Sequence, residues 1–171
     1  MTQNFHNYDT KFSYYIILYY KPKMKSSVLQ YQIIMFGVMV IVGMLFNPMN
    51  ILAYNTDDLY ISLTLFYGGL LMASNMMWAH ELVHYFSMGH FNKVVFLIGI
   101  VLSISISIFL LRKQLYVDDN QWLKRMISHH SSALTTSRKI YSSTDSMKIK
   151  HLAKDIVNTQ EREIQLMKSM L

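Results

Sequence analysis

The chain has 171 residues, a formal net charge of +6 and no cysteine. The lack of cysteine excludes disulfides and thiolate metal sites. Of the residues, 52% are hydrophobic, and they cluster in runs too long for an ordinary soluble protein. The basic residues flank these runs or alternate with acids, and no nucleic-acid motif accompanies them. The charge therefore predicts contact with a lipid bilayer and excludes a nucleic-acid partner.

Residues 1–27 are predicted to form an N-terminal tail. Its apolar stretch, residues 13–20, is too short to cross a bilayer. The run Met24-Lys25-Ser26-Ser27 before an apolar segment is typical of the start of a bacterial membrane protein. Either Met1 or Met24 is therefore a candidate for the first residue.

Residues 28–111 are predicted to form an all-α membrane domain with three transmembrane helices, at about 28–46, 59–79 and 93–111. Asn47 and Pro48 should end the first helix, because proline cannot sustain helical hydrogen bonds. Small residues in the second span favour close helix packing; they are Gly68, Gly69, Ala73 and Ser74.

The distribution of charge predicts the orientation in the membrane. The tail carries four lysines, whereas residues 47–58 carry only acidic charges. This places the N-terminus in the cytoplasm and the segment after the third span outside it. Arg112 and Lys113 oppose this orientation.

Residues 112–171 are predicted to form a helical hairpin. Asp118, Asp119 and Asn120 favour the start of one helix, which runs to about residue 141, and a second helix runs from about 145 to 170. We expect lysines of the second helix, Lys168 among them, to face water, and an inward stripe of Leu152, Ile156, Glu163, Ile164 and Met167. Because two such helices cannot enclose a core alone, we expect a homo-oligomer forming a four-helix bundle, or packing against the membrane.

Metal-binding residue types recur on both hairpin helices. Met126 and His130 are four apart and share a face, His129 lies beside them, and Glu163 and Met167 share a face of the second helix. Thioether and imidazole ligands suit copper, especially Cu(I). The alternative is structural, with one histidine at the helix interface and the other in solvent.

The same residues carry a family resemblance. Three motifs occur in order: Arg112-x-Gln114-x-x-Val117-x-Asp119, Met126-Ile127-x-His129-His130-Ser131-x-Ala133 and Gln160-x-x-Glu163-Ile164-x-x-Met167. Together they resemble the family named domain of unknown function 305. The resemblance implies a ferritin-like helical fold, copper binding outside the cytoplasm in some members, and a branch with three membrane helices. The chain departs from the family pattern, which has Pro, Met, Cys and Cys where this chain has Ser128, Thr136, Ser137 and Ala153. These changes bear on metal affinity more than on the fold.

A rival motif, His-Glu-Leu-Val-His, lies at residues 80–84. On a helix His80 and His84 can share a zinc ion, with Glu81 as general base. A catalytic site needs a third protein ligand, and Met88 and His90 are the nearby candidates.

The two histidines also belong to a ladder with a four-residue spacing: Met72, Met76, His80, His84 and Met88. Consecutive members are neighbours on a helix, so the ladder could bind or pass a soft cation. The alternative is that these residues only pack in the membrane or contact headgroups.

The sequence favours a non-catalytic membrane protein that binds copper or another soft metal through Met126, His129, His130, Glu163 and Met167. The cluster of Met76, His80, His84 and Met88 is a second candidate. Two other functions stay open: a membrane zinc metallohydrolase at residues 80–84, and a structural oligomerising protein without metal.

Overall fold

The computed structural model describes residues 28–171, and its regular structure there is helical, without any strand. This confirms the predicted all-α class. A compact unit comprises residues 32–171, and the contacts described below lie within it. The predicted tail, and with it the choice between Met1 and Met24, lies outside the described residues.

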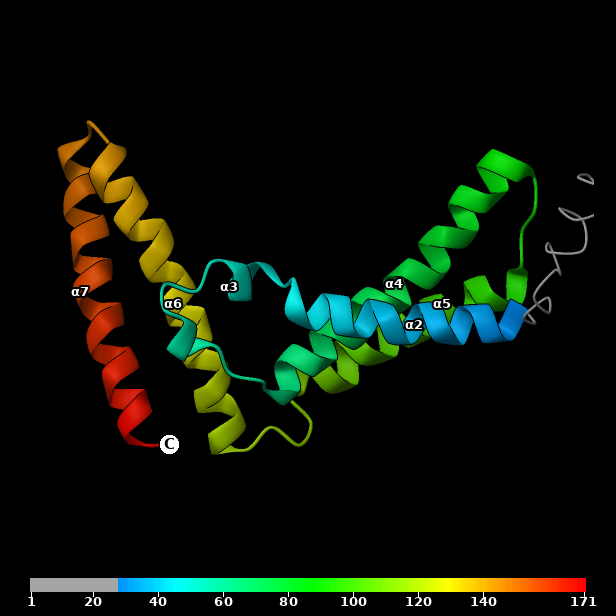
Figure 1. Cartoon of the computed structure of the whole chain (residues 1–171), viewed down its shortest axis with the longest axis horizontal. Helices are drawn as coiled ribbons and strands as arrows, with labels where there is room; N and C mark the ends of the chain where they lie inside the picture. The colour runs from blue at the N-terminus through cyan, green and yellow to red at the C-terminus, as the bar shows by residue number, and fades with distance from the viewer. Residues whose placement is uncertain (1–27) are drawn as a thin grey trace, which may run out of the picture. The chain divides into compact units, whose positions relative to one another are not determined.

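Three apolar helices come first: α2 (Val28–Leu45), α4 (Leu63–Met88) and α5 (Lys93–Ser105), which continues as a π-helical segment, η2 (Ile106–Arg112) (Figure 1). Two stretches, Gln30–Ile51 and Lys93–Arg112, are long and apolar enough to cross a membrane. Helix α4 begins later and ends later than the span predicted at 59–79, because Ser62 caps its start and Gly89, with φ of 68°, ends it.

Glycines allow the apolar helices to approach closely. A Cβ atom at Gly69 would lie 2.7 Å from the backbone oxygen of Val40, so α2 and α4 are in backbone contact there. A Cβ at Gly99 would lie 2.9 Å from the backbone nitrogen of Trp78, which joins α5 to α4 in the same way. The predicted role of small residues is confirmed for Gly69, whereas a Cβ at Gly68 would meet nothing within 4 Å.

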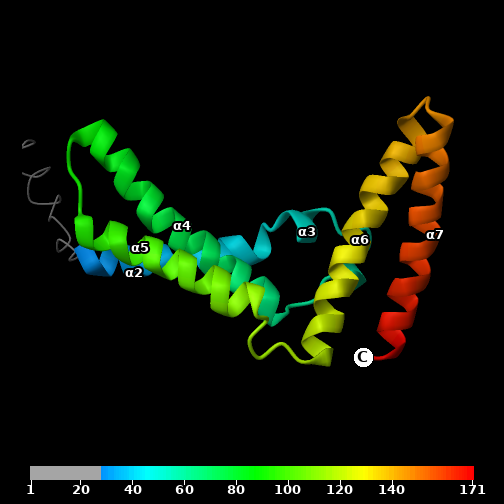
Figure 2. The same ribbon diagram turned by 180° about the vertical axis from the view of Figure 1, so that it is seen from behind.

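The hairpin consists of α6 (Asp119–Ser143) and α7 (Met147–Ser169), which lie side by side in both views (Figures 1 and 2). Asp118 caps α6 by accepting a hydrogen bond from the Gln121 backbone at 2.8 Å. Ser146 caps α7. The two helices enclose a small apolar core, formed by Leu123, Ile127, Leu134, Ile164 and Met167.

The predicted inward stripe of α7 is correct only in part. Ile164 and Met167 are buried as expected, and Ala153 joins them. Leu152 was predicted to face inward, but its side chain is 60% exposed. The face that contacts α6 therefore runs through Ala153, and Leu152 lies on a neighbouring face.

The connection between α2 and α4 contacts the hairpin. It contains a short helix, α3 (Pro48–Ile51), and a 3-10 turn, η1 (Thr56–Asp58), and both contact α6. Asn47 caps α3 and Pro48 occupies its first position, so the predicted interruption of the first apolar helix at these residues is confirmed.

Candidate functional site

One ionisable pair of the predicted metal cluster meets across the hairpin. Nδ1 of His130 on α6 lies 3.1 Å from Oε2 of Glu163 on α7. The His130 side chain is mostly buried, and Glu163 is partly open to solvent. The pair therefore places an imidazole and a carboxylate in contact at the rim of the helix interface.

His129 lies beside this pair on the outer surface of the hairpin. It is exposed, and its ring centroid is 5.9 Å from that of His130, in an edge-to-face arrangement. Burial lowers the pKa of His130 below its usual value, and the nearby His129 adds to this effect while Glu163 opposes it. A lowered pKa keeps the imidazole neutral, which is the form that binds metals.

The two thioethers of the cluster belong to the core. Met167 is buried in the apolar cluster, and Met126 is half-buried against it. Among residues 28–171, no three side chains of the His, Asp or Glu type are grouped so as to hold a metal ion. One chain thus brings His130 and Glu163 into contact with His129 adjacent, while both methionines pack in or against the apolar core.

The second candidate cluster lies on α4. The rings of His80 and His84 stack with centroids 5.5 Å apart, as the four-residue spacing predicts. Met72, Met76 and Met88 are exposed on the same helix.

Glu81, the general base of the rival motif, is tied into the helix packing. It is buried, Oε2 accepts a hydrogen bond from the Asn92 backbone at 2.9 Å, and Oε1 accepts one from Nε2 of Gln32 at 3.5 Å. The carboxylate thereby links α2, α4 and the start of α5. A carboxylate with both oxygens engaged in this way is poorly placed to activate water for hydrolysis.

A site that the sequence analysis missed lies where the loop before α4 meets the hairpin. Asp58 is only 1% exposed. One of its carboxylate oxygens accepts a hydrogen bond from the Ser131 hydroxyl at 2.6 Å, and the other pairs with the ammonium group of Lys168 at 2.6 Å. The side chains of α6 and α7 therefore converge on one acid from the loop.

Two serines of α6 fix the loop backbone around Asp58. The hydroxyl of Ser128 donates to the Asp58 carbonyl at 2.7 Å and accepts from the Tyr60 backbone at 3.3 Å. The hydroxyl of Ser131 accepts from the Tyr54 backbone at 2.8 Å. Ser128, which stands where the family resemblance implies a proline, therefore has a structural role.

Lys168 was predicted to face water, and the structure shows that this was wrong. Its ammonium group bonds to buried Asp58, and this contact raises the pKa of Lys168 above its usual value. The only sequence signals for this site were two adjacent acids in a loop and two serines three positions apart on a helix. Neither pattern identifies a partner.

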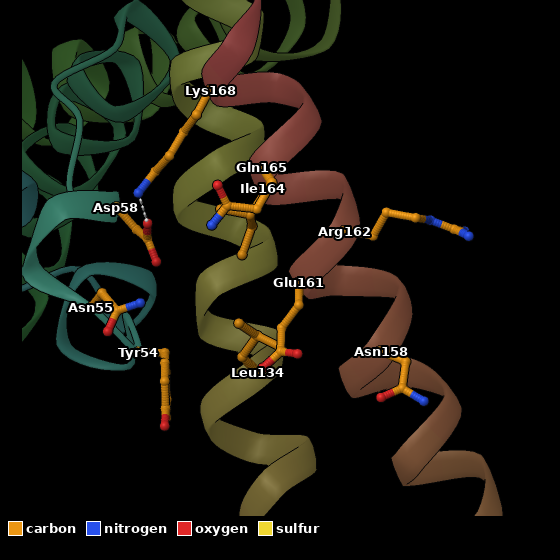
Figure 3. A pocket seen from close by; sticks show the side chains of 10 residues that line it. All are labelled: Tyr54, Asn55, Asp58, Leu134, Asn158, Glu161, Arg162, Ile164, Gln165 and Lys168. Atoms are coloured by element: carbon orange, nitrogen blue, oxygen red, sulfur yellow. Dashed lines mark ion pairs between the residues drawn. The ribbon is translucent and has the colours of Figure 1, made fainter.

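A polar cleft of about 510 Å³ lies next to the Asp58–Lys168 pair, between the loop and α7. Figure 3 shows the amides of Asn55 and Gln165 beside it, over a floor of Leu134 and Ile164. Arg162 and Asn158 extend away from the loop in the same view. The cleft has room for a small polar molecule.

Comparisons with known proteins agree with the motifs of the hairpin. Residues 111–171 match the family described as Domain of unknown function (DUF305). An uncharacterized protein, L153, of Acanthamoeba polyphaga mimivirus is 37% identical over 125 residues, which is 73% of this chain and 81% of that protein. This similarity extends well beyond the hairpin into the apolar helices. No solved structure matches the chain.

Proposed function

Since this chain carries a DUF305 domain and belongs to the same family as the mimivirus protein L153, we propose that it is a multi-pass membrane protein whose extracytoplasmic hairpin binds copper or another soft metal without catalysis. The observation that carries the proposal is the His130–Glu163 contact with His129 beside it. Imidazole and carboxylate groups are common metal ligands, and nearby thioethers favour copper.

The surfaces of the apolar helices support a place in the membrane. Only 11% of the most apolar window in Gln30–Ile51 and 17% of that in Lys93–Arg112 is buried within the chain. An apolar helix in the core of a soluble protein is mostly buried, so these exposed side chains suit contact with lipid. Helix α4, packed between them through Gly69 and Gly99, would be the third span.

The charges then give the orientation. Lysines in the N-terminal tail favour the cytoplasm for the N-terminus, and three spans lead to an extracytoplasmic hairpin. The acidic loop that holds Asp58 lies on the hairpin's side of the bilayer in this arrangement, as its contacts with α6 require.

The metal would bind on the surface of the hairpin that carries His129. His130 and Glu163 would contact an ion there, His129 is the neighbouring imidazole, and Met126 is half-buried on the same helix as the histidines. Met167 lies deeper in the core, so we propose that it supports the site by packing. The Glu81 carboxylate between His80 and His84 is hydrogen-bonded within the helix packing, so the proposal concerns the hairpin cluster alone.

Copper binding by the full chain in detergent tests the proposal. Cu(I) affinity is measured by competition with a coloured chelator for the wild type, for the double variant His129→Ala with His130→Ala, and for His151→Ala. His151 is an exposed histidine of α7 outside the cluster, so it is the matched control. We expect the double variant to lose at least 100-fold in affinity and the control to match the wild type. A wild type that binds no copper, or a double variant that binds it equally well, would refute the proposal.

A further inference from the structure

We propose that a second copy of this chain packs against the face of the hairpin opposite the loop, and that the metal site is shared between the two copies. The inference rests on the proposed metal function. A site completed by a second copy would explain why one chain holds only part of it.

The first half of this surface is a stripe on α6. Its members are spaced alternately four and three residues apart, as in helices that pack in pairs, and they are Trp122, Met126, His129, Ala133, Thr136 and Ile140. Trp122 and Ile140 are 51% and 43% exposed. This stripe excludes the core residues Leu123, Ile127 and Leu134, so the contact with α7 does not explain its spacing.

The second half is a stripe on α7 with the same alternation. Its members are Ile149, Leu152, Ile156, Thr159, Glu163, Leu166 and Met170. The four largest exposed apolar members, Ile149, Leu152, Leu166 and Met170, are 46% to 60% exposed. The stripe lies beside the buried face that runs through Ala153, Ile164 and Met167.

Both stripes lie on one side of the hairpin, away from the loop. The loop contacts α6 at Ser128 and Ser131 and contacts α7 at Lys168. An α-helix turns by about 100° per residue. By this rotation, the residues that contact the loop project to one side of the α6–α7 interface, and both stripes project to the other side. The His130–Glu163 contact lies at the rim on the stripe side, because Glu163 is itself a stripe member. We call this surface, made of the two stripes, the outer face.

The polar groups at its centre favour a second copy as the occupant of the outer face. The His129 imidazole on α6 and the Glu163 carboxylate on α7 lie near the middle of their stripes, and His130 lies at the rim between them. A two-fold arrangement that sets α6 against the partner's α7 brings His129 of one copy towards the partner's Glu163, and the reverse pair forms by symmetry. The same polar centre argues against burial of this face in lipid.

The shared site would be more complete than the site of one chain. One copy supplies His129, His130 and Glu163, and no group of three metal-binding side chains is preformed among residues 28–171. Two copies facing each other would bring four imidazoles and two carboxylates to one interface. The half-buried Met126 on each α6 would lie next to them.

The mass of the full chain in detergent, measured by native mass spectrometry, tests the occupant. We expect a dimer for the wild type and a monomer for Leu152→Glu with Leu166→Glu. Met147→Glu is the matched control, because Met147 is 65% exposed on α7 but lies outside the stripe; it should remain dimeric. Helix content by circular dichroism should be unchanged in all three. A monomeric wild type, or a double variant that still forms the dimer, would overturn the proposal.

Cu(I) affinity of the same proteins separates this inference from the metal function itself. We expect the monomeric Leu152→Glu, Leu166→Glu variant to bind Cu(I) at least tenfold more weakly, although it keeps every histidine. Full affinity in that monomer would overturn the shared site and leave the proposed function intact. A dimeric wild type that binds no copper would overturn the proposed function and the shared site together.

Because the chain has no cysteine, introduced cysteines can test the pairing directly. Thr136 and Thr159 lie on the two stripes at similar heights along the hairpin. Co-expressed Thr136→Cys and Thr159→Cys chains should form a disulfide-linked pair with each other under mild oxidation. Cross-linking of each variant only with itself would contradict the α6-to-α7 arrangement.

Discussion

The apolar helices and the hairpin each bury one carboxylate, and they use it differently. Glu81 accepts hydrogen bonds from the Asn92 backbone and the Gln32 amide, and among residues 28–171 it pairs with neither lysine nor arginine. Asp58 pairs with the ammonium group of Lys168 and accepts a hydrogen bond from the Ser131 hydroxyl. One acid is satisfied by neutral donors among apolar helices, and the other by a cation at a solvent-facing interface.

The difference follows from how each region gains stability. The apolar helices approach closely through backbone contacts at Gly69 and Gly99, a kind of packing that would replace the hydrophobic effect in the proposed lipid environment. The hairpin is amphipathic and buries a small core, and its docking on the loop relies on directional polar contacts. Substitutions among the apolar helices should therefore act on steric packing, and substitutions at the hairpin–loop contact should act on hydrogen bonds and ion pairs.

Loss of the Asp58 carboxylate should have the largest effect. Asp58→Ala leaves the Lys168 ammonium and the Ser131 hydroxyl without their partner, and breaking a buried pair costs about 3 kcal/mol. We expect this loss in the free energy of unfolding, measured by denaturant titration in detergent. Asp57→Ala is the control, because the neighbouring Asp57 is exposed. Equal stability of the two variants would mean that the loop contact does not hold the hairpin.

A side chain at Gly69 should have the next largest effect. Gly69→Ala places a Cβ 2.7 Å from the Val40 backbone oxygen, so α2 and α4 must separate, at a cost of about 1–3 kcal/mol. Gly68→Ala has open space and should be neutral or slightly stabilising. Thermal unfolding of the two variants compares them, and the same change in both would show that α2 does not pack at Gly69.

Neutralising Glu81 should cost less than removing Asp58. Glu81→Gln keeps one carbonyl acceptor for the Asn92 backbone and loses the stronger charge-assisted bond, so we expect a loss of about 1 kcal/mol. Glu81→Leu leaves the Asn92 donor unsatisfied and should cost about twice as much. If Glu81→Gln lowered the free energy of unfolding as much as Asp58→Ala does, the two carboxylates would not differ in the way their partners are held.

The pH dependence from His130 should be the smallest effect. Its pKa in the folded chain is lowered by burial from the ordinary value of 6.5, so the unfolded chain binds its proton first as the pH falls. The free energy of unfolding is therefore unaffected by His130 protonation above about pH 6.5. Below this pH it decreases, until the pH falls past the pKa of His130 in the folded chain. Unfolding midpoints between pH 5 and 8 for the wild type and His130→Gln test this, and the variant should show a flatter profile. A midpoint that rises on acidification would contradict the direction.

The sequence was sufficient for features set by local patterns. The all-α class, the break at Asn47 and Pro48, and the cap at Asp118 follow from composition and residue preferences near in the chain. The two-helix hairpin was also predicted from local signals, and in the structure it brings His130 and Glu163 together. The Asp58 site could not be predicted, because its partners lie far along the chain and no local sequence pattern marks a buried aspartate. Lys168 resembled its solvated neighbours for the same reason, and Leu152 was misplaced because α7 carries two adjacent apolar stripes.

The long reach of the Asp58 contact also sets an order of events during synthesis. Asp58 and Ser131 are 73 positions apart, and Lys168 comes later still. The loop therefore leaves the ribosome with a hydrated carboxylate, which loses its water in two stages, first as α6 arrives and then as α7 does. Until the second stage the carboxylate lacks its cation, and Lys168 of α7 completes the site. Docking of the hairpin on the loop therefore waits until α7 has been synthesised and has folded.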